Sequence, residues 1–389
     1  MSVEAAAGSG TRRAEGLYDV GIAGAGQLAR MTALAAWPLG ISVAVLGRPD
    51  EPAAPVAAAV VQGDWKDADA VARLGRAARL VTLENEFVDA RALAAVQAAG
   101  TPVRPGAAAM ARVQDKALQK ELLAGAGLPL PAHQVVEKPR ELAALGRDLG
   151  WPLVLKARTH GYDGYGNATC ANAEEAAEAL ARLDAGEGVL AEAFVPFERE
   201  LAAMVARNPS GQALAYPVVE TVQRDHVCHE VVAPARVPDA VAALAREVCL
   251  AAADAADGLG VTGVELFALP DGKVLVNEIA PRPHNSGHYT IEACETSQFE
   301  NHLRGVLDLA LGPVDLRAPA AAMVNLLGRR AGPSRPLPPE AMAAAGAHLH
   351  VYGKAQVRPR RKMGHVTALG DTPEEALALA RRGAAAADP

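Results

Sequence analysis

The sequence predicts a chain that combines α/β and α+β folds: a parallel, Rossmann-like domain comes first, and an α+β lobe and a β-rich part follow. Three observations predict this. A strand, a glycine-rich turn, a helix and a second strand follow one another from residue 18 onward, which is typical of a parallel βαβ unit. A glycine-rich loop at residues 160–167 separates two short apolar runs. Residues 263–280 form two further apolar runs joined by a Pro-Asp-Gly turn, a pattern that predicts a β-hairpin.

The first domain is expected to span residues 18–112, after a disordered tail at residues 1–17. Short apolar runs alternate with helical segments along it, as a parallel sheet requires. The expected strands are 18–23, 41–46, 56–62, 79–83 and 102–104, and the expected helices follow the glycine turn at 24–29 or begin near 68 and 89.

Two lobes and a terminal region are expected to follow. A small α+β lobe spans 113–190, a larger β-rich lobe spans 191–332, and a proline-rich boundary at 333–339 opens a β-rich C-terminal region, 333–389. Expected strands of these parts are 151–158, 168–170, 189–194, 200–207, 213–219, 348–352 and 365–369, and expected helices are 114–126, 173–184 and 239–256.

Size, charge and cysteine usage limit the classes of protein. The 389 residues are enough for two or three domains. A formal net charge of −7, with no basic stripe interleaved with aromatic residues, argues against a nucleic-acid partner. No apolar run is long enough for a membrane span, and the first residues lack the apolar core of a signal peptide. The four cysteines have no CxxC spacing, so we expect reduced thiols and a cytoplasmic protein.

The predicted hairpin carries a carboxylate on each strand, Glu265 and Glu278, within runs rich in Val, Leu and Ile. A buried carboxylate is unfavourable unless a positive group compensates it, so two on adjacent strands predict one shared cation. Oxygen ligands without nearby thiolates favour Mg²⁺. Solvated, outward-facing glutamates are the alternative. A dense group of polar side chains follows the second strand: Arg282, His284, Asn285, Ser286 and His288.

Two glycine-rich segments are candidate phosphate sites. Residues 24–29 fit GxGxxA, but a dinucleotide site also needs an acidic residue after the second strand, where Gly47 stands. This turn could hold another phosphate at the helix N-terminus, or only allow close packing. The loop at 160–167 could offer backbone N–H groups to phosphates. Lys156, just before it, suits an α/β-phosphate contact, although a surface lysine along an apolar stem is the alternative.

Two further segments suit anions or a nucleotide. The strand and bend at 190–200 offer backbone groups to a flat base and a carboxylate to ribose hydroxyls. Basic and imidazole groups gather at 348–354 and 358–365 in an otherwise acidic chain. Arg suits bidentate phosphate binding and Lys acts as a point charge, so these residues predict an anion site. Solvated surface charge is the alternative.

Together these segments resemble the ATP-grasp superfamily and, within it, the N5-carboxyaminoimidazole ribonucleotide synthetase family. The resemblance covers residues from about 18 to 370, and the motifs at 277–288 and 361–365 are the most specific. The other motifs lie at 26–31, 114–116, 161–164, 194–197, 216–220 and 297–299.

The resemblance implies an ATP-grasp fold preceded by the Rossmann-like domain, with a small β-rich region at the C-terminus. It implies an ATP-dependent carbon–nitrogen ligase of de novo purine biosynthesis. ATP would phosphorylate bicarbonate to carboxyphosphate, and the amine of 5-aminoimidazole ribonucleotide would receive the CO₂ unit. ATP and Mg²⁺ are the implied cofactors, with Mn²⁺ as an alternative ion, and a homodimer is the implied assembly.

The resemblance also implies roles for individual residues. Those assigned to ATP are Lys116, Lys156, Gly161, Tyr162, Asp163, Gly164, Glu192, Val195 and Glu200. Those assigned to the metal are Glu265 and Glu278. Those assigned to bicarbonate or carboxyphosphate are Arg282, His284 and Asn285. Those assigned to the ribonucleotide are Gln27, Glu84, Ser286, Lys354, Arg361 and Lys362. Residues 160–167 are hypothesised to be a lid that excludes water from carboxyphosphate.

Departures from the family pattern leave alternatives open. The family's loop commonly has a basic residue where Tyr165 stands, and further differences occur at Gly47, His160, Asn167, Ala193 and Thr221. Most concern the nucleotide half of the site. An ATP-grasp paralogue acting on a different amine is therefore an alternative. A nucleotide-binding protein without catalysis and a nicotinamide dehydrogenase are weaker ones.

Overall fold

The computed structural model describes residues 16–159, 161, 166–336 and 346–387. Residues 1–15 of the expected N-terminal tail lie outside these ranges, as do Tyr162, Asp163 and Gly164 of the expected lid.

The N-terminal domain is built on a parallel sheet in the order β3-β2-β1-β4. Apolar side chains pack on both of its faces, which is why its strands are continuous apolar runs. Asp67 and Asp89 cap two of its helices by accepting backbone N–H groups. Its elements are β1 (Val20–Ala23), α1 (Gln27–Ala36), η1 (Trp37–Leu39), β2 (Val43–Gly47), β3 (Ala59–Gln62), α2 (Ala68–Ala77), β4 (Val81–Leu83), α3 (Ala90–Ala98) and α4 (Ala107–Val113).

The small lobe contains an antiparallel sheet in the order β5-β8-β6-β7, covered by two helices. Asp115 caps the helix that leads into this lobe, and Asn172 caps its last helix. The elements are α5 (Lys116–Gly125), β5 (His133–Val136), α6 (Pro139–Leu149), β6 (Leu153–Ala157), β7 (Asn167–Cys170), α7 (Ala173–Leu183) and β8 (Val189–Ala193).

The large sheet is antiparallel and runs in the order β14-β13-β9-β11-β12-β15-β19-β17, with β10 paired to β9. The C-terminal strands β17 and β19 continue this sheet through β15. Its strands are β9 (Arg199–Arg207), β10 (Ala213–Ala215), β11 (Val219–Arg224), β12 (Val227–Ala233), β13 (Gly260–Ala268), β14 (Val274–Ala280), β15 (Ala320–Leu327), β17 (Ala347–Val351) and β19 (Lys362–Gly370). The remaining elements are α8 (Asp239–Ala255), η2 (Asn285–Gly287), α9 (Thr290–Ala293), α10 (Gln298–Val306), β16 (Gly332–Pro333), β18 (Gln356–Val357) and α11 (Pro373–Ala386).

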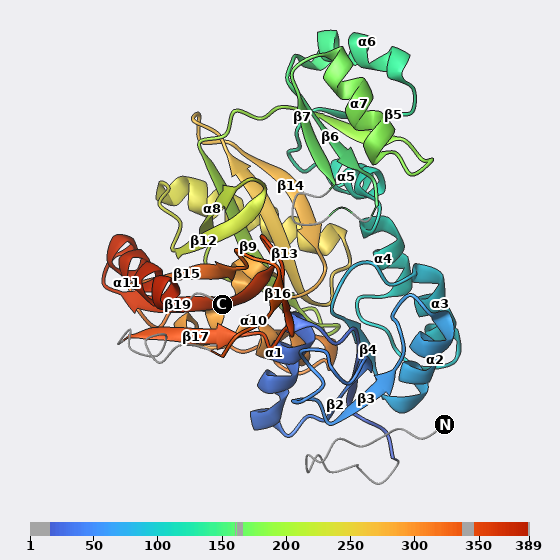
Figure 1. The fold of residues 1–389 in the computed structure, drawn as a ribbon, viewed down its shortest axis with the longest axis vertical. Coiled ribbons are helices and arrows are strands. Elements are labelled where there is room, and N and C mark those ends of the chain that lie inside the picture. Colours follow the sequence, from blue (N-terminus) through green and yellow to red (C-terminus); the bar gives the residue numbers. More distant parts are fainter. Residues whose placement is uncertain (1–15, 160, 162–165, 337–345, 388–389) are drawn as a thin grey trace.

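The hairpin predicted from the sequence is confirmed. β13 and β14 pair antiparallel, and Glu265 and Glu278 are direct cross-strand partners. The register shifts immediately beyond them, because Leu266 pairs with Val276 and Asn277 is the extra residue on β14. Such a β-bulge redirects side chains. Figure 1 shows the small lobe at the top of the molecule, the N-terminal domain at the lower right, and the hairpin in the large sheet between them.

The described helices also bear on membrane association. None of them combines the length and the apolar character that crossing a membrane would require. None of the four cysteines forms a disulfide in the described structure, and all four are buried.

Candidate active site

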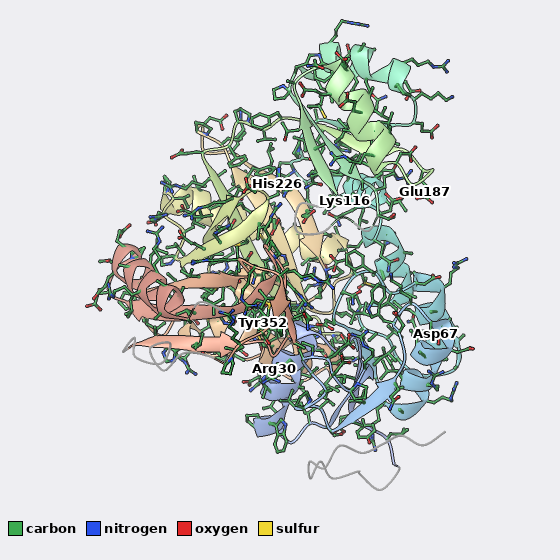
Figure 2. The ribbon with its side chains drawn as sticks, viewed as in Figure 1. Arg30, Asp67, Lys116, Glu187, His226 and Tyr352 are labelled. Carbon is green, nitrogen blue, oxygen red and sulfur yellow. The ribbon has the colours of Figure 1, made fainter. Side chains whose placement is uncertain are left out.

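A cavity of about 1200 Å³ lies where the three parts of the chain meet, and it brings most of the candidate residues together. The candidates that line it are Gln27, Glu84, Lys116, Lys156, Gly161, Glu192, Val195, Glu200, Glu265, Glu278, Arg282, His284, Asn285, Lys354, Arg361 and Lys362. Ser286 is buried beside it, and its Oγ has no hydrogen-bond partner within the described part of the chain. Figure 2 labels Lys116 at the junction of the small lobe with the large sheet.

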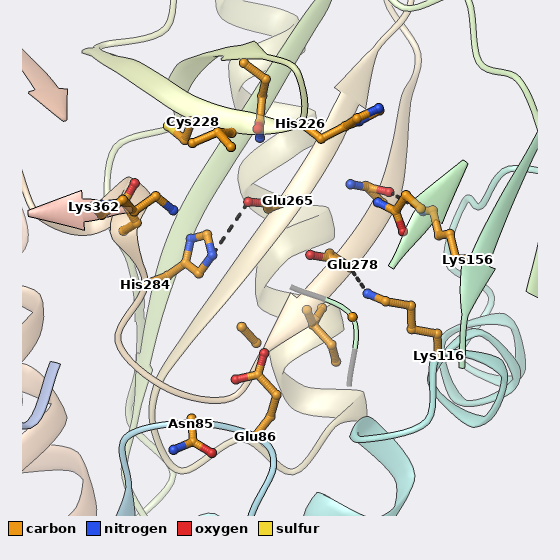
Figure 3. A pocket seen from close by; sticks show the side chains of 18 of the residues that line it. Asn85, Glu86, Lys116, Lys156, His226, Cys228, Glu265, Glu278, His284 and Lys362 are labelled. Atoms are coloured by element: carbon orange, nitrogen blue, oxygen red, sulfur yellow. Dashed lines mark hydrogen bonds and ion pairs between the residues drawn. The ribbon is translucent and has the colours of Figure 1, made fainter. Parts of the chain in front are cut away.

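The carboxylate pair faces this cavity rather than open solvent (Figure 3). Glu278 forms an ion pair with Lys116, and Oε1 of Glu265 lies 3.7 Å from Nε2 of His284. Burial and the neighbouring Glu278 raise the pKa of Glu265 to about 8. Burial alone would raise the pKa of Glu278 too, but Lys116 and Lys156 lower it to about 2.

The pair fits a divalent ion. Two carboxylates on one face, beside cationic groups that suit phosphates, match the oxygen ligands of Mg²⁺. Among the described residues no group of three or more His, Cys, Asp or Glu side chains converges as a metal site. Phosphate oxygens and water would therefore complete the coordination, as is usual for Mg²⁺ bound with a nucleotide.

Lys156 belongs to a buried cluster, so the alternative of a surface lysine is wrong. It is 6% exposed, and its Nζ lies 2.7 Å from Oε2 of Glu192 and 2.9 Å from Oδ1 of Asn277. Lys120 contacts the other oxygen of Glu192 at 3.0 Å. The sequence analysis missed Lys120 and Asn277. The four-residue spacing of Lys116 and Lys120, which puts both on one helix face, was a usable signal.

The nucleotide edge follows β8. Val195 and the half-exposed Phe194 line the cavity there, and Phe197 stacks on Phe267 with ring centroids 4.8 Å apart. Glu200, on β9, is the expected ribose ligand. Its Oε2 is buried and lacks a hydrogen-bond partner among the residues described, and burial raises its pKa to about 7 despite Lys156. A ligand hydroxyl would satisfy this oxygen.

The loop between β6 and β7 begins and ends at closely spaced glycines. A Cβ on Gly166 would lie 2.6 Å from the Cα of Gly161, so the two ends of the loop can come this close only because neither residue has a side chain. The hypothesised lid function of this loop stays a prediction, since most of its residues lie outside the described ranges.

Arg282 is held by a residue from the N-terminal domain. Its Nη2 donates to Oε1 of Glu86 at 2.9 Å, and its Nε contacts the other oxygen of that carboxylate. The sequence analysis missed Glu86, because a sequence alone does not show that a glutamate contacts an arginine 196 positions away. Burial, Arg282 and Lys362 lower the pKa of His284 to about 3, so its imidazole is neutral. Asn285 exchanges two amide hydrogen bonds with Asn325, at 3.0 and 2.7 Å.

The expected phosphate site at the glycine turn is occupied by the protein's own carboxylate. Glu84 accepts the backbone N–H of Leu28 at 3.1 Å and that of Gly26, so it compensates the N-terminus of α1. A Cβ on Gly26 would collide with this carboxylate. The glycines therefore permit the approach of Glu84, and a ligand phosphate at this turn stays a prediction.

The basic C-terminal cluster divides into two parts. Nζ of Lys354 donates to Oε1 of Gln27 and to the carbonyl of Lys362, both at 2.6 Å, at the cavity wall. Two of its histidines instead stack on one another: the half-buried His350 and the buried His365 have ring centroids 4.5 Å apart. Figure 2 labels Tyr352 beside Arg30 at this junction of the C-terminal strands with α1.

Comparison with known proteins decides the family. A model described as an ATP-grasp domain matches residues 121–299, one described as a ribonucleotide synthetase preATP-grasp domain matches 17–114, and one described as a phosphoribosylaminoimidazole carboxylase C-terminal domain matches 321–379. An N5-carboxyaminoimidazole ribonucleotide synthase from Synechococcus elongatus is 44% identical over 90% of this chain and 89% of its own length. The chain belongs to the N5-carboxyaminoimidazole ribonucleotide synthase family.

Solved structures of this synthase family share the fold. The synthase of Aspergillus clavatus in complex with ATP has a TM-score of 0.88 and 39% identity, over 95% of this chain and 98% of that chain. The Aspergillus clavatus synthase with ADP and 5-aminoimidazole ribonucleotide has a TM-score of 0.86 and 38% identity, over the same shares. The predicted ATP-grasp fold with a preceding parallel α/β domain is confirmed, and the dehydrogenase alternative is excluded.

Proposed function

We propose that this chain is an ATP-dependent carbon–nitrogen ligase that carboxylates 5-aminoimidazole ribonucleotide with bicarbonate, giving N5-carboxyaminoimidazole ribonucleotide in purine biosynthesis. The observation that carries the proposal is that one cavity joins the carboxylate pair and its lysines to Arg282 and to Lys354. ATP, bicarbonate and a phosphorylated amine are all anionic, so a shared site needs this concentration of positive charge.

The ATP half of the site lies between the small lobe and the hairpin. Lys116 and Lys156 would contact the phosphates, β8 and Val195 the adenine, and Glu200 the ribose. Glu265 and Glu278 would hold Mg²⁺, or Mn²⁺ in its place. When bound, the ion offsets the charge of the phosphates during transfer. Lys116 forms an ion pair with Glu278, and a phosphate contact of this ammonium would replace that pair.

The transfer half is centred on Arg282. A bicarbonate oxygen attacks the γ-phosphorus, the bond to ADP breaks, and carboxyphosphate forms. The amine nitrogen then bonds to the carboxyl carbon, phosphate leaves, and the amine loses a proton. Arg282 offers two parallel N–H groups to the bicarbonate or carboxyphosphate oxygens. In the described structure Glu86 holds this guanidinium, which fixes its orientation. His284 stays neutral beside it and adds no charge.

The ribonucleotide is assigned to the other end of the cavity. Lys354, Arg361 and Lys362 line it together with Gln27, and an ammonium and a guanidinium suit a 5′-phosphate. Ser286 is predicted to support this half. Asn285 is assigned to the transfer half with Arg282, and its amide pairs with Asn325. A homodimer and a cytoplasmic location stay predictions, which sedimentation and localisation experiments would check.

An ADP-release assay tests the proposal. ADP should form only when ATP, Mg²⁺, bicarbonate and 5-aminoimidazole ribonucleotide are all present, and omission of any one should abolish it. ADP formation with another amine but not with this ribonucleotide would favour the paralogue with a different acceptor. No ADP under any condition would favour a nucleotide-binding protein without catalysis.

A further inference from the structure

A second lysine of α5 lies behind the ATP half of the cavity and contacts both lobes. Lys120 is 2% exposed and, among the described residues, is not one that lines the cavity. Its Nζ lies 3.0 Å from Oε1 of Glu192, 2.8 Å from the carbonyl of Asn277 and 3.2 Å from that of Val276. Two of the three N–H donors of this ammonium bind the two carbonyls, and Glu192 is its ion-pair partner.

The contacts of Lys120 join the nucleotide strand to the metal strand. Glu192 lies on β8, along which the adenine is expected, and it also binds Lys156 at 2.7 Å. Asn277 immediately precedes Glu278 on β14, and its side chain binds Lys156 while its carbonyl binds Lys120. One carboxylate and two ammonium groups thus connect α5, β6 and β8 with β14.

The β-bulge explains why β14 needs such a contact. Asn277 is the extra residue opposite the step from Glu265 to Leu266, and a bulge interrupts the regular pairing of backbone groups. Lys120 donates to the carbonyl of the bulge residue and to that of Val276 before it. Lys120 thereby links the backbone that leads into Glu278 to Glu192 on β8, in addition to the pairing with β13 and to the hydrogen bonds between Gln119 and Ile279.

The cluster is a poor source of stability. Three buried charges carry a large desolvation penalty, and an apolar replacement of such clusters is often neutral or stabilising. Burial lowers the pKa of Lys120 to about 8 in spite of Glu192, with Lys156 acting in the same direction and Glu278 against it. A role in positioning accounts for the lysine better than a role in holding the fold together.

We propose that Lys120 is a positioning residue that sets the metal strand, and with it Glu278, in place against the nucleotide strand. It acts through the carbonyls of Val276 and Asn277 and through Glu192, and it does not touch ATP. The inference rests on the proposed function only in that β8 binds a nucleotide and Glu278 a divalent ion.

The test compares ADP binding with and without Mg²⁺ in wild type, Lys120→Met and Lys120→Gln. Methionine keeps the length and leaves Glu192 and Lys156 as a balanced pair, whereas glutamine keeps neutral N–H donors for the carbonyls. Lys138→Met, at an exposed lysine of the same lobe, is the matched control. Equilibrium dialysis with ADP measures the affinity without Mg²⁺, and the same dialysis across a series of Mg²⁺ concentrations gives the Mg²⁺ concentration at which the increase in ADP affinity is half-maximal.

Loss of the residues that orient metal ligands typically weakens metal binding or activity about 10–100-fold. In Lys120→Met we expect metal-free ADP affinity to stay within about twofold of wild type, while the Mg²⁺ requirement rises and turnover falls by factors in that range. Lys120→Gln should lie between Met and wild type, and Lys138→Met should match wild type.

Two outcomes overturn the inference. Equal losses of metal-free and Mg²⁺-dependent ADP affinity would make Lys120 a nucleotide contact. Wild-type Mg²⁺ dependence in both variants would remove its role. If Lys120→Met does not fold, Lys120→Gln decides by the same criteria. The binding measurements need no carboxylation, so a wild-type protein that fails to act on 5-aminoimidazole ribonucleotide would contradict the proposed function without touching this inference.

Discussion

Acid is predicted to weaken the contact between the N-terminal domain and the large sheet through one buried histidine. His302, on α10, is 1% exposed. Its Nδ1 accepts the backbone N–H of Val261 at 3.1 Å, so the neutral ring carries its proton on Nε2. That nitrogen lies 3.0 Å from Oγ1 of Thr82 on β4. The imidazole therefore bridges β13 and the parallel sheet only while it is neutral.

The magnitude follows from linkage. Burial lowers the pKa of His302 from its ordinary value of 6.5 to about 3. The folded protein disfavours protonation of this imidazole. The contribution of neutral His302 to the unfolding free energy is therefore complete above the pKa of the unfolded chain and is lost as pH falls from about 6.5 toward 3. A pH of 5 lies about 1.5 units below the pKa of this histidine in the unfolded chain, and this difference corresponds to a loss of about 2 kcal/mol of unfolding free energy.

Urea unfolding at pH 7.5 and pH 5.0 measures this loss in wild type, His302→Gln and the surface control His348→Gln. Other buried histidines also contribute to the wild-type drop, so the comparison between variants isolates His302. The unfolding free energy of His302→Gln should fall by about 2 kcal/mol less than that of wild type. His348→Gln should follow wild type. An equal drop in wild type and His302→Gln would refute the reasoning.

Three further predictions concern the cavity and its support. Lys354→Met should raise the KM for 5-aminoimidazole ribonucleotide about tenfold or more, because the substitution removes the charged hydrogen bond to Gln27 and the expected phosphate contact. Steady-state kinetics should show an unchanged KM for ATP. Arg282→Lys should lower kcat/KM for bicarbonate about 10²-fold, since a lysine cannot make the bidentate contact, and an unchanged value would remove Arg282 from this role. Asn325→Ala should reduce the unfolding free energy by about 1–3 kcal/mol, because the buried amide of Asn285 loses its partner; an unchanged urea midpoint would contradict this.

The elements that local patterns specify were predictable. The Pro-Asp-Gly turn between two apolar runs predicted the β13–β14 hairpin with one carboxylate on each strand, Glu265 and Glu278, and the structure pairs them directly. The glycine turn likewise predicted β1 and α1. The observed ends of these elements differ from the predicted ends by a few residues, because residue propensities do not define where a strand or helix stops. Strands β5 and β15 and helices α6, α10 and α11 were missed. For α6 the sequence did carry usable signals, because Pro139 opens the helix, Glu141 stands at its third position and Gly150 follows its end.

The rest of the site depends on contacts that sequence does not encode locally. Regular alternation would place Asn277 and Glu278 on opposite faces, and only the bulge brings both to the cavity. Glu86 comes from a different domain than Arg282, and Glu84 meets the glycine turn of its own domain from 56 positions away, so both contacts arise through tertiary packing. Their roles became visible only once the distances were known.

The central claim is that Glu265 and Glu278 together hold the divalent ion that accompanies ATP. The most direct measurement is Mn²⁺ binding in the presence of ADP, followed by electron paramagnetic resonance, in wild type and Glu278→Gln. The substitution keeps the size of the side chain but removes its charge, so Mn²⁺ affinity should fall about tenfold or more and ADP formation should be lost, with an unchanged circular dichroism spectrum. Wild-type Mn²⁺ affinity and turnover in Glu278→Gln would contradict the account.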